Sequence, residues 1–171
     1  MVSDYGGFSV DWRLVGTGWA KVDVRAGGAQ VTITASYLSD PLTSVVEAAA
    51  RLLSGSTQST VSFEEEPGEY LWILRRMDES RVRLRILAFG LERAHPTAPI
   101  ESLDGQTASV VLDVELETLE FATGVLQALR LIEGDYGLDG YEKEWVRYAF
   151  PLAQKAHLEA AIIQASEKPV E

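Results

Sequence analysis

The chain of 171 residues has the composition of an ordinary globular protein, with 46% hydrophobic and 24% charged residues, and a length typical of one domain. It contains no cysteine, which excludes disulfide bonds, thiolate nucleophiles and sulfur-ligated metals. The net charge is −11, and residues 94–171 carry fourteen acidic against five basic side chains. Because nucleic acids and anionic membranes are bound through lysine and arginine, we expect neither as a partner.

Nothing near the beginning of the chain is typical of a targeting signal. Residues 1–5 show no cationic stretch followed by an apolar run. No segment approaches the roughly 18 consecutive apolar residues of a membrane span. We therefore expect a cytoplasmic protein that forms a single domain over residues 1–171.

The first third of the chain alternates and then changes period. Alternating apolar side chains predict strands over residues 8–14, 20–24 and 31–37, with Gly27 and Gly28 suited to a tight turn. Asp40 and Pro41 are typical of a helix start. Apolar residues at helical spacing then predict a helix over 42–53 that ends at Gly55.

Four more strands and up to three helices are predicted from the rest. The strands cover 61–65, 70–77, 81–89 and 109–116, with a proline-containing loop around residues 94–99. The helices cover 119–132, 141–148 and 152–165. The sequence therefore predicts the α+β class. We expect a mainly antiparallel sheet of six or seven strands, in the order ββ-α-ββββ-α-α, with the helices packed on one face.

The central hairpin supplies the candidate binding residues. A two-residue loop at Asp78 and Glu79 would place one set of side chains on a common face, pairing 76 with 81, 74 with 83 and 72 with 85. An arginine beside a tryptophan can stack on it, and arginines can hold an anion or a partner's carboxylates. The predicted binding residues are Trp72, Arg76, Arg81, Arg83 and Arg85.

Two alternatives to this binding face remain open. Glu64 and Glu66 on the preceding strand could neutralise the arginines, which would leave an ordinary solvated face. A longer hairpin loop would move Trp72 to the other side of the sheet, because a slip of one residue exchanges the two faces.

No cofactor or metal site is predicted. The segment 135–140 resembles the start of a calcium loop, but it has Gly137 and Val146 where side-chain oxygens are required. His95 and His157 lack ligand-spaced neighbours. We find no nucleophile or phosphate-binding motif, and paired carboxylates at 64–66 or 115–120 would need desolvation to act in catalysis. Most aromatic side chains are expected in the core.

Two segments resemble a known family. Residues 37–42 (YLSDPL) and 65–72 (EEPGEYLW) are similar to segments of a bacterial family of small stand-alone proteins with no assigned function, over roughly residues 30–150. The resemblance implies a bacterial origin and no particular activity.

Taken together, these features favour a non-catalytic domain that binds a protein partner, either as an immunity-type protein or by self-association. The alternative is a small enzyme or ligand-binding domain with a pocket between helices and sheet, lined by tyrosine, tryptophan and arginine.

Overall fold

The structure is a computed structural model that describes residues 7–168. In chain order its elements are β1 (Ser9–Leu14), β2 (Trp19–Ala26), β3 (Ala29–Ser36), α1 (Pro41–Leu53), β4 (Gln58–Glu64), β5 (Glu69–Arg76), β6 (Arg81–Phe89), a 3-10 turn (Glu92–Ala94), β7 (Ile100–Leu103), β8 (Gln106–Glu117), α2 (Thr118–Trp145) and α3 (Leu152–Ser166). Residues 1–5, on which the expectation about targeting signals rests, lie outside the described residues.

The strands form two antiparallel sheets. One has the order β1-β2-β3, and the other has the order β4-β5-β6-β8-β7. The predicted α+β class and antiparallel pairing are confirmed. The described residues, however, contain eight strands in two sheets, where six or seven strands in one sheet were expected. The additional strand β7 follows the proline-containing loop and pairs with β8 through a tight turn at Asp104 and Gly105, both with positive φ.

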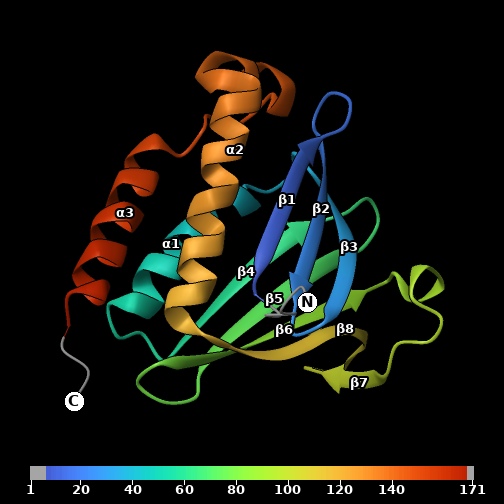
Figure 1. The fold of residues 1–171 in the computed structure, drawn as a ribbon. Helices are drawn as coiled ribbons and strands as arrows, with labels where there is room; N and C mark the ends of the chain where they lie inside the picture. Colours follow the sequence, from blue (N-terminus) through green and yellow to red (C-terminus); the bar gives the residue numbers. More distant parts are fainter. Residues whose placement is uncertain (1–6, 169–171) are drawn as a thin grey trace, which may run out of the picture.

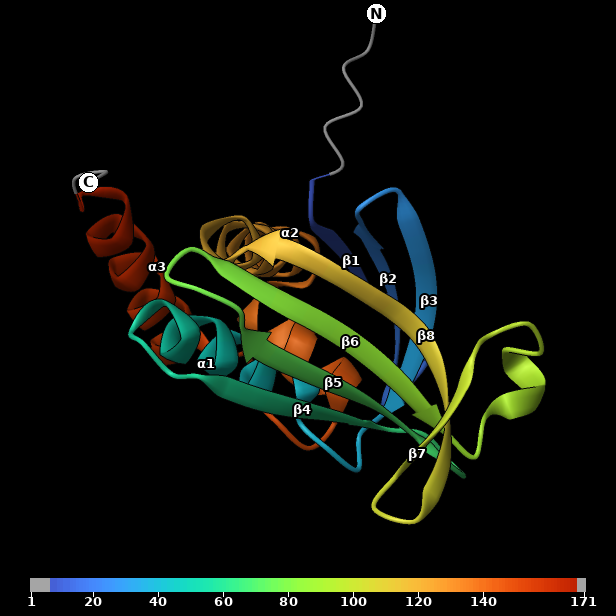
Figure 2. The same ribbon diagram turned by 90° about the horizontal axis from the view of Figure 1, so that it is seen from below.

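The helices and the three-stranded sheet lie on the same side of the five-stranded sheet, as Figures 1 and 2 show. Helix α1 packs beside β4, α2 packs along β1, and α3 contacts both of these helices. We call the covered side of the five-stranded sheet its inner face and the opposite side its outer face. Figure 2 looks onto the outer face, with β4, β5, β6 and β8 in front and the helices behind.

Helix α1 forms where the sequence predicts it. The Asp40 carboxylate accepts a hydrogen bond from the Thr43 amide at 3.4 Å, and Pro41 occupies the first turn. Burial is the main cause that raises the pKa of Asp40 above its ordinary value. The apolar stripe of this helix, including Leu42, Val46 and Leu52, is almost completely buried.

Large aromatic side chains fill the space between the layers. Trp72 stacks on Phe63 with ring centroids 4.9 Å apart, and Trp12 lies 5.7 Å from the same ring. Tyr141 and Trp145 from α2 are fully buried in the same core. The expected core position of most aromatic residues is confirmed. Trp12, Trp72, Tyr141 and Trp145 therefore fill the core and do not line a pocket between helices and sheet.

Helix α2 consists of two helical segments that meet at a kink at Gly137, where φ is 68° and ψ is 174°. The first segment is longer than the helix predicted over 119–132, and the second, which ends at Trp145, overlaps the short helix predicted over 141–148. Among the described residues, no helix is both long enough and apolar enough to cross a membrane.

Candidate functional site on the outer face of the sheet

The β5–β6 hairpin differs from its predicted register by one residue. Trp72 lies opposite Ile86, Ile73 opposite Arg85, and Arg75 opposite Arg83. The loop spans residues 77–80 rather than two residues. The Asp78 carboxylate accepts hydrogen bonds from the amides of Ser80 and Arg81, both at 2.9 Å, and so stabilises this longer turn. The predicted pairings across the hairpin are therefore wrong.

Trp72 is on the inner face and not beside the arginines. Its side chain is fully buried, between Phe63 and the rest of the core. The expected stacking of Arg85 on Trp72 is consequently wrong, because the longer loop turns Trp72 inward.

Arg76 also points toward the inner side, at the end of β5, where it contacts the end of α1. Its guanidinium donates to the carbonyl oxygen of Leu52 and, at 3.2 Å each, to those of Ser56 and Glu79. Carbonyl groups at the end of a helix lack partners within the helix, and a cation there is favourable. Arg76 thus joins α1 to the hairpin loop and is not part of the outer face.

Arg81, Arg83 and Arg85 do line the outer face, as a row along β6. Arg83 forms a bidentate pair with Asp113, with both N–O distances at 2.7 Å. Arg81 pairs with Asp78 at 2.9 Å and with Glu115 at 3.2 Å. Arg85 pairs with Glu101, and its Nε lies 3.4 Å from Asp113.

The carboxylates that neutralise this row come from β7, β8 and the hairpin loop, and not from Glu64 and Glu66. The alternation Asp113, Glu115, Glu117 along β8 places acidic side chains on the same face as the arginines. The hydrogen bonds from Arg83 hold the pKa of Asp113 below its ordinary range, and the Asp113 carboxylate in turn raises the pKa of Arg83. Because Arg81 and Arg83 keep almost half of their side-chain surface in water, this is a hydrated array of charges.

Three further side chains of β5 complete this surface and were not predicted. Leu71 and Ile73 are half-buried on the outer face, and Arg75 is exposed beside them. Arg75 lies directly opposite Arg83, and none of the described residues forms an ion pair with it. Like charges in directly opposed positions are destabilising, and Arg75, unlike Arg83 with its Asp113 partner, has no carboxylate among the described residues to offset this opposition. We define the outer-face site by Leu71, Ile73, Arg75, Arg83 and Arg85.

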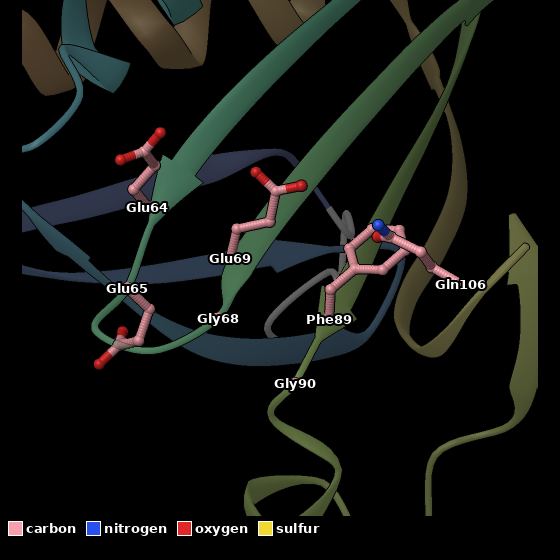
Figure 3. Close-up of a pocket in the computed structure, with 7 residues that line it drawn as sticks. All are labelled: Glu64, Glu65, Gly68, Glu69, Phe89, Gly90 and Gln106. Carbon is pink, nitrogen blue, oxygen red and sulfur yellow. The ribbon is translucent and has the colours of Figure 1, made fainter. Parts of the chain in front are cut away.

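An acidic hollow of about 360 Å³ lies at one end of the sheet, shown in Figure 3. The side chains of Glu64 and Glu69 point to one side of it and that of Glu65 points to the other. Glu69 accepts a hydrogen bond from Ser62 at 2.8 Å, and Glu65 accepts one from Thr34. The carboxylates are thus held by the fold, and they add negative charge at the margin of the outer face.

The remaining candidates do not form a common site. The Tyr70 hydroxyl lies 2.9 Å from Nε2 of His95, and burial lowers the pKa of this histidine and raises that of Tyr70 to about 12. His157 is exposed on α3, and residues 135–140 belong to α2. Within residues 7–168, no three or more histidine, aspartate and glutamate side chains gather as metal ligands would.

Comparison with known proteins adds little to this geometry. No protein-family model matches the sequence, and neither does any curated protein. The predicted family resemblance therefore stays a prediction. Among solved structures, the chain is similar to a chain of the CdiA-CT/CdiI toxin and immunity complex from Enterobacter cloacae, with 14% identity and a TM-score of 0.47, over 72% of this chain and 99% of that chain. A TM-score this low supports neither a shared fold nor a shared function.

Proposed function

We propose that this protein is a non-catalytic cytoplasmic domain that binds a protein partner through the outer-face site. The observation that carries the proposal is Arg75, an exposed cation opposite Arg83 and beside half-buried Leu71 and Ile73, on the side of the sheet that faces away from the helices. Protein interfaces are enriched in arginine and combine a small apolar centre with a charged rim. This face has that composition.

Two electrostatic effects define the kind of partner, namely the net charge of the whole protein and the local charge of the outer-face site. At long range, the net charge of −11 attracts a basic protein and accelerates its encounter. In contact, an acidic side chain of the partner would relieve the opposition of Arg75 and Arg83 with a charge-assisted hydrogen bond. An immunity-type protein, which neutralises a basic toxin by complementary charge, is one form of this function and would be bacterial.

A charge-reversal pair tests the proposal. Arg75→Glu changes the outer-face site, and Arg130→Glu makes the same change in net charge at an exposed position of α2, on the helical side of the molecule. We expect native-lysate enrichment with the unmodified protein to recover a basic protein in stoichiometric amount. Arg130→Glu should retain this protein and Arg75→Glu should lose it, with unchanged circular dichroism in both.

Two results would contradict the proposal. One is retention of the same partner by Arg75→Glu, which would place the contact elsewhere. The other is the absence of any stoichiometric partner, together with a thermal shift produced by a metabolite or metal. That outcome would favour the alternative of a ligand-binding domain or enzyme.

A further inference from the structure

The outer edge of β4 has a defined pattern of backbone groups. The Arg76 amide donates to the Thr57 carbonyl at 2.8 Å, and the Glu65 amide donates to the Gly68 carbonyl at 2.9 Å. Because hydrogen-bonded positions alternate in an antiparallel pair, the odd-numbered residues between these points face β5. The amide and carbonyl groups of Gln58, Thr60, Ser62 and Glu64 therefore point away from the sheet.

One of these outward groups confirms the pattern. The Glu64 amide donates to the Ser39 hydroxyl at 3.2 Å, across the free edge. For the amides of Gln58, Thr60 and Ser62, no side-chain or loop acceptor lies within hydrogen-bonding distance among the described residues. The open part of the edge is therefore centred on Thr60.

At the β1 edge of the three-stranded sheet, in contrast, backbone amides have side-chain acceptors. Helix α2 packs along β1 as α1 packs beside β4, but side chains of α2 also accept from amides at the two ends of β1. Glu120 accepts from Phe8 and the Tyr136 hydroxyl accepts from Leu14, each at 3.0 Å. Edge strands are otherwise protected by proline, lysine, inward charges or bulges. Strand β4 reads Gln-Ser-Thr-Val-Ser-Phe-Glu, with a single charge at its far end and a regular register with β5.

We infer that β4 is a self-association edge, at which a second copy of this chain adds its own β4 in antiparallel orientation about a two-fold axis near Thr60. A two-fold interface places the same strand against itself, so every side chain near the axis must tolerate its own copy. Gln58, Thr60 and Ser62 are uncharged hydrogen-bonding residues, and paired threonines and serines are favourable across strands. The two five-stranded sheets would then be continuous, with both outer-face sites on one side.

Salt dependence separates this edge from the outer-face site. Two copies that each carry a charge of −11 repel one another, whereas the edge itself is neutral from Gln58 to Phe63. Added salt screens the repulsion without weakening the strand pairing, so dimerisation should increase with ionic strength. Binding of a basic partner should decrease with ionic strength.

The test is analytical ultracentrifugation of the full chain over a wide concentration range, at low and high salt. We expect a reversible dimer for the unmodified protein and for Thr60→Ala. Thr60→Pro removes an outward amide and no bond to β5, since proline is tolerated where the amide faces away from the sheet. Because the two-fold axis places the substitution in both copies, Thr60→Pro removes two hydrogen bonds from the dimer. The dimer dissociation constant should therefore rise at least about tenfold.

A second pair of variants keeps the test decisive if Thr60→Pro does not fold. Thr60→Glu opposes two like charges at the axis and should weaken the dimer several-fold, whereas Thr107→Glu, at an exposed position of β8, should not. The inference is overturned if the unmodified protein sediments as a monomer throughout, or if Thr60→Glu and Thr107→Glu dimerise equally well. Because Thr60 lies opposite Ile73, Thr60→Glu also adds a carboxylate beside the outer-face site, and only the uncharged Thr60→Pro and Thr60→Ala separate the two surfaces. Either of these two variants should still capture the basic partner and lose it on Arg75→Glu.

Discussion

The Arg83–Asp113 pair should contribute little to stability even though its geometry is bidentate. Both of its hydrogen bonds are 2.7 Å long, but the two side chains keep 44% and 34% of their surface in water. Ion pairs with such exposure are worth about 0.2–1 kcal/mol. We therefore expect a double-mutant cycle of Arg83→Gln and Asp113→Asn to give a coupling energy of no more than about 1 kcal/mol. The cycle removes the contribution of Arg85, which also lies near Asp113.

The coupling can be measured by urea unfolding of the four proteins, followed by the fluorescence of the buried tryptophans. It should shrink in high salt, because exposed charges are screened. A coupling of about 3 kcal/mol that persists in high salt is typical of a desolvated pair and would refute this reasoning. In that case the arginine row would be a structural element. A small coupling would instead mean that arginine variants remain folded, so that their loss of binding reports on the surface.

Two further predictions concern the packing of α2 against Phe8 and the hairpin loop at 77–80. Gly124→Ala should destabilise the protein by about 1–3 kcal/mol, because a β-carbon there would lie 2.8 Å from the Phe8 carbonyl oxygen. Gly134→Ala in the same helix meets nothing within 4 Å and should stabilise the protein by about 1 kcal/mol. Equal effects of the two variants on the urea midpoint would contradict the close approach of α2 to Phe8. The amide of Ser80 is the main cause that lowers the pKa of Asp78 to about 2, so the stability it contributes is complete above pH ~4 and is lost as the pH falls toward 2. Asp78→Asn should therefore reduce the loss of stability in this window, and an unchanged acid profile of the urea midpoint would show that the turn at 77–80 forms without the carboxylate.

Local sequence signals were sufficient for the elements that are determined by neighbouring residues. Helix α1 combines a capping aspartate, a proline in the first turn and one apolar stripe, and each of these acts within a few residues. Strands β4, β5, β6 and β8 were predicted for the same reason, since alternation is local. Strand β7 was missed because its four residues follow a proline-containing loop and acquire their partners only from β8.

Features that depend on tertiary packing could not be predicted. The division into two sheets depends on where the chain places β4 after α1, since β4 pairs with β5 and not with β3. The close approach of Gly124 to Phe8 joins residues that are far apart in the sequence. Asp113 and Glu115, which pair with Arg83 and Arg81, lie 30 and 34 residues away on β8, and the strand order β6-β8 brings them together.

The one-residue error in the predicted β5–β6 register changed which residues of β5 face outward, but it did not change the outward position of the arginines on β6. Over residues 81–86 of β6 only one face is apolar, since Val82, Leu84 and Ile86 point inward, and the arginines between them must face outward whatever the length of the loop. On β5 both faces are apolar, with Tyr70, Trp72 and Leu74 on one side and Leu71 and Ile73 on the other, so alternation alone could not decide which set joins the arginines. The length of the hairpin loop determines which set joins the arginines, and the hydrogen bonds to the Asp78 carboxylate stabilise the four-residue loop. The exchange turns a cation–aromatic surface into one in which Arg75 opposes Arg83 beside aliphatic side chains. A partner that recognises this surface is therefore expected to supply a carboxylate and an apolar side chain. A partner that would need to stack on an exposed indole ring is not expected, because Trp72 is buried.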